Sequence, residues 1–300
     1  MNIRFVPRAE IDKVKFNSCV HYANNGNVFG YLWYLDFIAK DWDALVEGDY
    51  ESVMPLPWRK NRLGQKVIVT PALIRELGVY SIHVLSPRRI AAFLEAIPAE
   101  FRGVRLRLNE QNPPPRDQGF QLRERTNQQL LLQQPYVEMS ESFSRDLLLE
   151  LERAERADLL PVGNISVEEV ADFFRQHGAQ DAETERSFHG LQRIMYNILH
   201  RGWGGSTGIR NRAGELLAVA FWIYTHKKLV SLLLLESPAG KEVGARAQLL
   251  NLQLRSHAER ALILDFNTLE ENAFAESFGA KQNDFYEIER GRSWNFWGVR

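Results

Sequence analysis

Residues 206–236 read STGIRNRAGELLAVAFWIYTHKKLVSLLLLE, and most of the fold can be predicted by working outward from them. Three runs with strand character are separated by the turn residues NRAG at 211–214 and HKK at 226–228. Short runs of this kind between turn residues are typical of strands in an antiparallel meander. We therefore expect three consecutive antiparallel strands in this stretch.

The residues after the meander predict alternating helices and strands. An apolar stripe at three- and four-residue steps follows the expected loop SPAGKEVG (237–244) and consists of Ala247, Leu250, Leu254, Ala258 and Ala261. Such a stripe is typical of an amphipathic helix. The sequence then predicts, in order, a short buried strand (261–266), a helix ending at Gly279 (267–279) and a last strand (284–290).

The first half of the chain predicts a similar order of elements. Ser86 and Pro87 are the expected N-cap and first residue of one of its helices. The expected elements are a helix (29–42), a hairpin (43–60), a strand (65–71), a helix (86–97) and two further strands (103–109 and 128–139). We interpret this as an internal duplication of architecture, with a boundary just after Val137 and domains at 1–137 and 138–300.

The second domain is predicted to begin with a helix at 143–159, whose Leu147, Leu151 and Ala154 line one face. A strand at 159–163 and two helices follow. The first of these helices lies at 164–178 and opens with Ser166 and Glu169 in capping-box spacing, and the second lies at 185–202.

Composition excludes several classes of function. The chain has 37 basic and 38 acidic residues and a formal net charge of -1, so no overall field favours duplex nucleic acid as a partner. Cys19 is the single cysteine, which excludes an intramolecular disulfide and a multi-cysteine zinc site and suits a reducing cytoplasm. No stretch approaches the roughly 18 apolar residues of a membrane span, so we expect neither secretion nor membrane insertion.

Other catalytic motifs receive little support from their context. Residues 204–208 (GGSTG) fit the pattern of a nucleophile elbow around Ser206, but that motif follows a strand and opens a helix, whereas here the order is reversed. We therefore expect a helix-to-strand turn at Ser206. The seven histidines lack the spacing of metal ligands, so we expect no metal site and histidines that are exposed or singly bonded. No phosphate-binding P-loop or dinucleotide motif is present.

The order of elements after residue 206 resembles the second half of the GNAT acyltransferase fold. In that family a loop Gln/Arg-x-x-Gly-x-Gly/Ala holds the pyrophosphate of coenzyme A with backbone N–H groups at a helix N-terminus. The segment KEVGAR at 241–246 resembles this loop, with lysine in the first place and arginine in the last. The resemblance implies acyl-coenzyme A as cofactor. The implied binding residues are Lys241, Val243, Gly244, Ala245 and Arg246.

A later family signature, Tyr-x-x-x-Gly-Phe, is similar to AESFGA at 275–280, where Ala275 replaces the tyrosine that often serves as general acid. A pair of GNAT-like domains in one chain resembles the bacterial Fem-type aminoacyltransferases and related FemAB-like proteins. In that group a basic helix precedes the second domain. Here the corresponding segment, 143–162, mixes arginines with acidic residues.

This resemblance implies an α/β fold of two tandem GNAT-like domains, the second of which carries the donor site. The implied function is transfer of an acyl or aminoacyl group to a small-molecule or peptide amine, with aminoacyl-tRNA as a further candidate donor. The departures in the donor loop and at Ala275 leave an alternative open. A non-catalytic binding or scaffold protein on the duplicated fold would show the same departures.

Three residues are candidates for catalysis within this interpretation. Glu236 ends the strand 228–236 and is the expected general base. Asp265 ends the next strand and is either a substrate contact or the neighbour of Asn267, which could cap the following helix. Tyr286, or alternatively Tyr224, could replace the acid missing at Ala275, although an aromatic residue in a strand usually serves packing.

A second group of residues is expected to contact substrate. Trp58, Arg59 and Lys60 lie near a turn at the end of a predicted strand, and Tyr224 lies on the second strand of the meander. Clefts between domains are common ligand sites, and the two cations could meet an anionic group there. The alternative is that the aromatic side chains belong to the core and that the cations are solvated.

Overall fold

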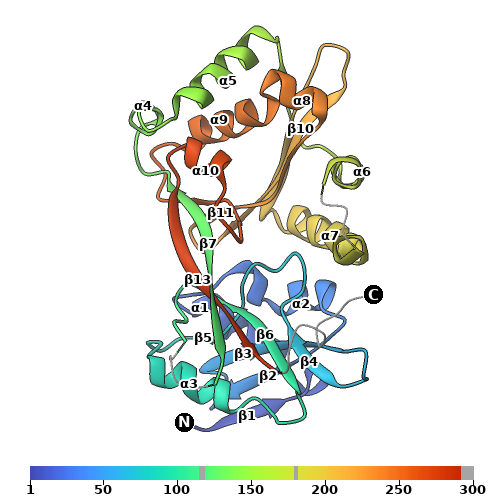
Figure 1. Ribbon diagram of the computed structural model, residues 1–300, viewed down its shortest axis with the longest axis vertical. Coiled ribbons are helices and arrows are strands. Elements are labelled where there is room, and N and C mark those ends of the chain that lie inside the picture. Colours follow the sequence, from blue (N-terminus) through green and yellow to red (C-terminus); the bar gives the residue numbers. More distant parts are fainter. Residues whose placement is uncertain (115–118, 179–181, 292–300) are drawn as a thin grey trace. The chain divides into compact units, whose positions relative to one another are not determined.

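A computed structural model of the chain describes residues 1–114, 119–178 and 182–291 (Figure 1). The chain forms two compact units. The first comprises residues 1–126 together with the chain from Asp284 onward, and the second comprises residues 127–283. None of the described helices combines the length and the apolar character that crossing a membrane requires.

The first unit is built on a mixed sheet in the order β1-β2-β3-β4-β6-β13. Its strands are β1 (Ile3–Val6), β2 (Asp41–Glu47), β3 (Ser52–Lys60), β4 (Lys66–Val69), β5 (Tyr80–Ser81, beside β3) and β6 (Gly103–Leu108), and its α-helices are α1 (Lys13–Tyr22), α2 (Leu32–Ile38) and α3 (Pro87–Glu95). Neighbouring strands on this path are antiparallel, except that β4 and β6 run parallel. The crossover between them contains α3, as parallel pairing requires.

The second unit has its sheet in the order β8-β9-β10-β11-β12-β7. Its strands are β8 (Leu160–Gly163), β9 (Gly204–Arg210), β10 (Leu216–Thr225), β11 (Lys228–Glu236) and β12 (Ile263–Asp265). Its helices are α4 (Tyr136–Ser140), α5 (Arg145–Arg156), α6 (Val167–His177), α7 (Ala182–Arg201), α8 (Pro238–Val243), α9 (Ala245–His257) and α10 (Ala273–Ser277). Figure 1 shows α5, α8 and α9 on one face of strands β9–β11, and α6 and α7 on the other.

The two units share one order of strand pairing, because β11 and β12 repeat the parallel arrangement of β4 and β6. The strand beside that pair comes from the other half of the chain in each case. In the first unit, β13 (Lys281–Arg290) lies antiparallel to β6, and in the second, β7 (Gln121–Leu131) lies antiparallel to β12. The predicted division after Val137 therefore differs from the observed units. The boundary falls within β7, and the end of β13 belongs to the first unit.

Several helix boundaries agree with the local sequence signals. The Ser86 hydroxyl accepts a hydrogen bond from the backbone N–H of Arg89 (3.2 Å), and Ser166 accepts one from Glu169 N–H (3.1 Å). Both predicted caps are confirmed. The Glu169 carboxylate does not complete a capping box among the described residues, and it instead accepts a hydrogen bond from Arg210. The predicted three-stranded meander is also confirmed as β9, β10 and β11.

Four local predictions are wrong. The helix expected over 29–42 is shorter, and residues 41–42 already belong to β2. The strand expected over 128–139 ends at Leu131, and Pro135, which lacks an N–H for strand pairing, precedes α4. The expected loop at 237–244 is largely α8, because Ser237 caps it by accepting a hydrogen bond from Gly240 N–H (3.0 Å). The helix expected over 267–279 is confined to α10.

Candidate functional site

In the second unit the pairing between the parallel strands β11 and β12 stops partway along β11. They pair from Lys228 with Ile263 to Val230 with Asp265, and β12 then ends. β11 continues to Glu236, which pairs with Ala218 of β10. Among the described residues, the segment Ser231–Glu236 therefore pairs with β10 on one side and with no strand on the other. Such an edge presents backbone donors and acceptors with which an extended ligand can pair.

The corresponding place in the first unit is filled by the chain itself. Beyond β4, Thr70 N–H donates to the carbonyl of Arg105 (3.0 Å), and Leu77 N–H donates to that of Arg107 (2.8 Å). The Arg107 guanidinium also donates to three backbone carbonyls, those of Pro71, Ile74 and Arg75. Because this segment runs along β6, the candidate site is assigned to the second unit.

Glu236 carries an unusual combination of contacts at the end of β11. Its side chain is 10% exposed, and its Oε1 lies 3.1 Å from Nη2 of Arg246. Its Oε2 is buried and has no hydrogen-bond partner among the described residues, and the same holds for Nε of Arg246. The Arg246 guanidinium also lies over the ring of Phe274, 4.1 Å from its centroid. A buried carboxylate with a free oxygen can accept a proton or a hydrogen bond from a ligand.

Gly244 forms the junction between α8 and α9, where it has a φ of 72°. A Cβ atom at this position would lie 2.8 Å from both the carbonyl oxygen and Cγ of Glu150, so α5 covers the junction. Burial raises the pKa of Glu150, and the negative charge of Glu236 raises it further. Two carboxylates beside a covered junction disfavour a pyrophosphate on this face of Gly244 in the observed conformation.

The other residues implied to hold coenzyme A surround this junction. Ala245 is buried, and Val243 packs partly buried against the core of the second unit. Lys241 and Arg246 place positive charge near Glu150, which partly offsets the rise in its pKa. The five residues are therefore close together, but the glycine at their centre contacts α5.

Gly244→Asp is expected to lower the free energy of unfolding by about 2–4 kcal/mol, because an L-residue is strained at positive φ and its Cβ would overlap Glu150. Urea denaturation measures this change. Gly214→Asp is the matched control, since Gly214 also has a positive φ (83°) but has nothing within 4 Å of its Cβ position. We expect the control to cost only about 1 kcal/mol. Equal costs for the two variants would show that Glu150 does not restrict Gly244.

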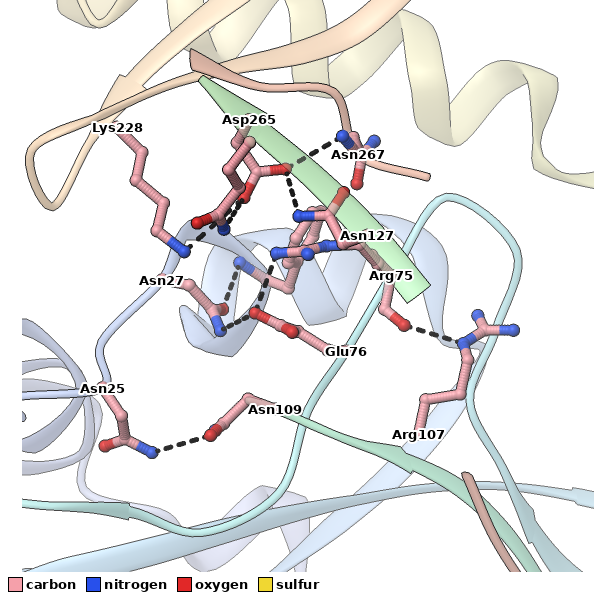
Figure 2. Close-up of polar contacts among 12 residues, drawn as sticks. Asn25, Asn27, Arg75, Glu76, Arg107, Asn109, Asn127, Lys228, Asp265 and Asn267 are labelled. Carbon is pink, nitrogen blue, oxygen red and sulfur yellow. Dashed lines mark hydrogen bonds and ion pairs between the residues drawn. The ribbon is translucent and has the colours of Figure 1, made fainter. Parts of the chain in front are cut away.

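Asp265 lies in a closed polar network rather than at an open site (Figure 2). Its carboxylate is fully buried and accepts hydrogen bonds from Asn127 Nδ2 (3.0 Å), Gln129 Nε2 (3.1 Å) and the N–H of Asn267 (2.9 Å). The Lys228 ammonium lies 3.5 Å away. Three hydrogen-bond donors and an ammonium group surround the carboxylate, which indicates a structural role.

The expected cap at Asn267 is wrong. The N-cap of α10 is Asn272, whose side chain accepts hydrogen bonds from the N–H groups of Phe274 (3.0 Å) and Ala275 (3.3 Å). Ala275 itself is fully buried. Ser206 is also not in a turn. It lies within β9, and its hydroxyl donates to the carbonyl of Ile165 (2.6 Å).

The remaining predicted site residues lie at separate places. Tyr224 is 43% exposed at the end of β10, where its hydroxyl lies 2.7 Å from Nε2 of His257. Tyr286 belongs to the first unit, paired with Leu108 of β6. Trp58, at the end of β3, donates a hydrogen bond to Asp43 (2.8 Å), and Arg59 and Lys60 follow it. The structure thus joins Glu236 and Arg246 but places Trp58, Arg59 and Lys60 in the first unit.

Three residues around these sites were not expected from the sequence. Glu150 lies three residues after Leu147 and one before Leu151, both of which belong to the buried face of α5. That position was the only feature of the sequence that could have indicated its partial burial. Nothing in the sequence indicated that Phe274 would lie at the site. His257 is buried rather than exposed, and its ring nitrogens have several hydrogen-bond partners, so the expectation for the histidines fails there. Among the described residues no group of three or more His, Cys, Asp or Glu side chains could hold a metal ion.

No family model and no curated protein matches the sequence. Solved structures do match along nearly the whole chain. FemX superposes with a TM-score of 0.65 at 11% identity, covering 95% of this chain and 97% of that one. L-PGS from Bacillus licheniformis has a TM-score of 0.55 at 13% identity, covering 92% of this chain and 91% of that one. A tandem GNAT protein from the clavulanic acid biosynthesis pathway has a TM-score of 0.55 at 15% identity, covering 96% of this chain and 98% of that one. These likenesses confirm the predicted α/β fold of two tandem GNAT-like domains.

Proposed function

We propose that this chain, with its FemAB-like tandem GNAT fold, transfers an aminoacyl group from an ester donor to an amine. The observation that carries the proposal is the part of β11 that continues beyond the end of β12. It leads to Glu236, whose buried Oε2 has no hydrogen-bond partner among the described residues and can accept a proton. A fold does not fix a function, so the proposal rests on this site in the second unit.

In the proposed reaction the donor extends along the unpaired edge of β11. Glu236 takes a proton from the acceptor ammonium group, and the resulting amine attacks the carbonyl carbon of the donor ester. An amide bond forms while the ester C–O bond breaks. Glu236 has by then passed its first proton to solvent. The attacking nitrogen gives up its second proton through Glu236 to the leaving alkoxide, so that an alcohol departs and the carboxylate is regenerated.

The geometry at Gly244 favours an aminoacyl ester over an acyl-coenzyme A donor. Coenzyme A would bring a pyrophosphate to the α8–α9 junction, which Glu150 covers and where its carboxylate lies within electrostatic range of Glu236. Like charges in a partly buried site are disfavoured. An aminoacyl-tRNA donor does not require a pyrophosphate at this position. Acyl-coenzyme A remains the second candidate donor, supported by the GNAT-like fold alone.

The donor can be identified by direct transfer assays. Purified protein is incubated with a panel of amines, which consists of free amino sugars and a lysine-containing peptide. The donor is either tRNA charged with radiolabelled amino acids or radiolabelled acetyl-coenzyme A. We expect label to move to an amine from charged tRNA at a rate at least tenfold above that from acetyl-coenzyme A. A preference for acetyl-coenzyme A would overturn the proposed donor.

Absence of transfer from both donors would instead favour a non-catalytic scaffold. One observation already supports that alternative, because Glu236 is engaged by Arg246 in the observed conformation. Thermal shift with each donor separates the two outcomes. A scaffold that binds the donor is stabilised by it without turnover, whereas a protein that binds neither donor shows no shift.

A further inference from the structure

A second cluster of reactive side chains lies in the second unit, away from Glu236. Tyr224 is near the end of β10 that pairs with the start of β11, and Glu236 is at the opposite end of β11. The Tyr224 side chain is exposed, but its hydroxyl lies 2.7 Å from Nε2 of His257, the last residue of α9, which is only 6% exposed. The hydroxyl of a partly exposed tyrosine is thus held against a buried imidazole.

The hydrogen bonds of His257 determine which of its ring nitrogens carries the proton. Nδ1 lies 2.9 Å from the backbone carbonyl of Gln253 and 2.8 Å from the hydroxyl of Ser256. Because a carbonyl can only accept, Nδ1 must be the donor. Burial lowers the pKa of His257, which favours the neutral ring. Nε2 therefore presents a lone pair, and Tyr224 donates its hydroxyl proton to it.

This order of groups is that of an activated nucleophile. In hydrolytic triads a hydroxyl donates to an imidazole whose other nitrogen is fixed by an acceptor, and here the Gln253 carbonyl takes the place of the acidic residue. The positive charge of Arg260 acts on both rings, favouring the phenolate of Tyr224 and the neutral form of His257. Burial of Tyr224 raises its pKa, so the phenol needs a base in order to react.

We propose that Tyr224 and His257 form a nucleophilic pair that accepts an acyl group from an activated ester. The phenolic oxygen of Tyr224 attacks the ester carbonyl and forms a new C–O bond, while its proton moves to Nε2 of His257. The C–O bond to the leaving alcohol then breaks, and the alkoxide leaves with the electron pair. The imidazolium releases its proton to the leaving group or to water, and the product is O-acyl-Tyr224. The site is independent of the transfer reaction assigned to Glu236.

The pair is tested with p-nitrophenyl acetate, and acetylation is followed residue by residue by peptide mass spectrometry. Tyr22, which is 73% exposed, serves as an internal reference in the same sample. We expect Tyr224 to be acetylated at least tenfold faster than Tyr22, although it is less exposed. His257→Gln is expected to reduce the Tyr224 rate by about 10²-fold, the lower end of the range of general-base effects, and to leave the Tyr22 rate unchanged.

His83→Gln is the matched control, because His83 is an exposed histidine of the first unit, and we expect both rates to be unaffected. Tyr224→Phe should remove the acetylated peptide and the matching release of p-nitrophenol. A Tyr224 rate no higher than that of Tyr22 would overturn the proposal, and this comparison needs only the unmodified protein. A Tyr224 rate that is unchanged in a folded His257→Gln variant would overturn it equally, since a merely structural hydrogen bond gives that result.

Discussion

Glu236→Gln is expected to reduce the rate of acyl or aminoacyl transfer by about 10²–10⁴-fold, the range that general-base catalysis supplies. Glutamine preserves the size of the side chain and one acceptor oxygen but cannot take a proton from the acceptor amine. This loss corresponds to about 3–5 kcal/mol of transition-state stabilisation. Initial rates at saturating donor and acceptor measure it directly.

Glu152→Gln provides the control for this experiment, because Glu152 is an exposed residue of α5 whose recorded ion pair is with Arg156 on the same helix. We expect this variant to keep the full transfer rate. Circular dichroism and denaturation midpoints establish that both variants are folded. If Glu236→Gln retained more than half of the transfer rate, Glu236 could not be the base, and the ion pair with Arg246 would be its main role.

Asp265→Ala is expected to lower the free energy of unfolding by about 3–5 kcal/mol, the usual cost of breaking a buried charged pair. The substitution leaves Lys228, only 16% exposed, without the carboxylate beside it, and it removes the acceptor used by Asn127 and Gln129. Each buried donor that loses its acceptor adds a desolvation cost. Denaturant unfolding monitored by tryptophan fluorescence measures the change.

Two further variants identify the source of this cost. Asp265→Asn keeps one acceptor oxygen but removes the charge, so we expect an intermediate loss of stability. Asp172→Ala removes an exposed aspartate from α6 in the same unit and should change stability by less than about 0.5 kcal/mol. A cost for Asp265→Ala as small as that of Asp172→Ala would show that the network in Figure 2 contributes little to stability.

Elements whose signals are local could be predicted from the sequence. The meander of β9, β10 and β11 is specified by apolar runs between turn residues, and the starts of α3 and α6 by Ser86 and Ser166. Local signals also misled, most clearly at α8. The segment SPAGKEVG opens α8 with the same Ser-Pro cap as α3, but it was expected to be a glycine-containing loop.

Features that depend on distant contacts were not predictable. Glu150 and Gly244 are far apart in the sequence, and periodicity in α5 shows which face is buried but not which glycine lies against it. The same limit applies to Asp265, for which the sequence allowed either a substrate contact or a place beside a helix cap. The side chains of Asn127, Gln129 and Lys228, from two other strands, form the closed network instead. Among the site residues, the sequence placed Glu236 at the end of its strand but gave no sign of its ion pair with Arg246.

The exchange of final strands between the two halves has a consequence for biosynthesis. The first unit needs β13, since Phe285 and Ile288 are almost fully buried there and Tyr286 pairs with β6. A ribosome adding about 5–20 residues per second reaches β13 roughly 9 to 35 seconds after β6. During that interval the nascent first unit has an open sheet edge at β6, a surface prone to wrong pairing. The portion of the protein that is synthesised first is therefore completed last.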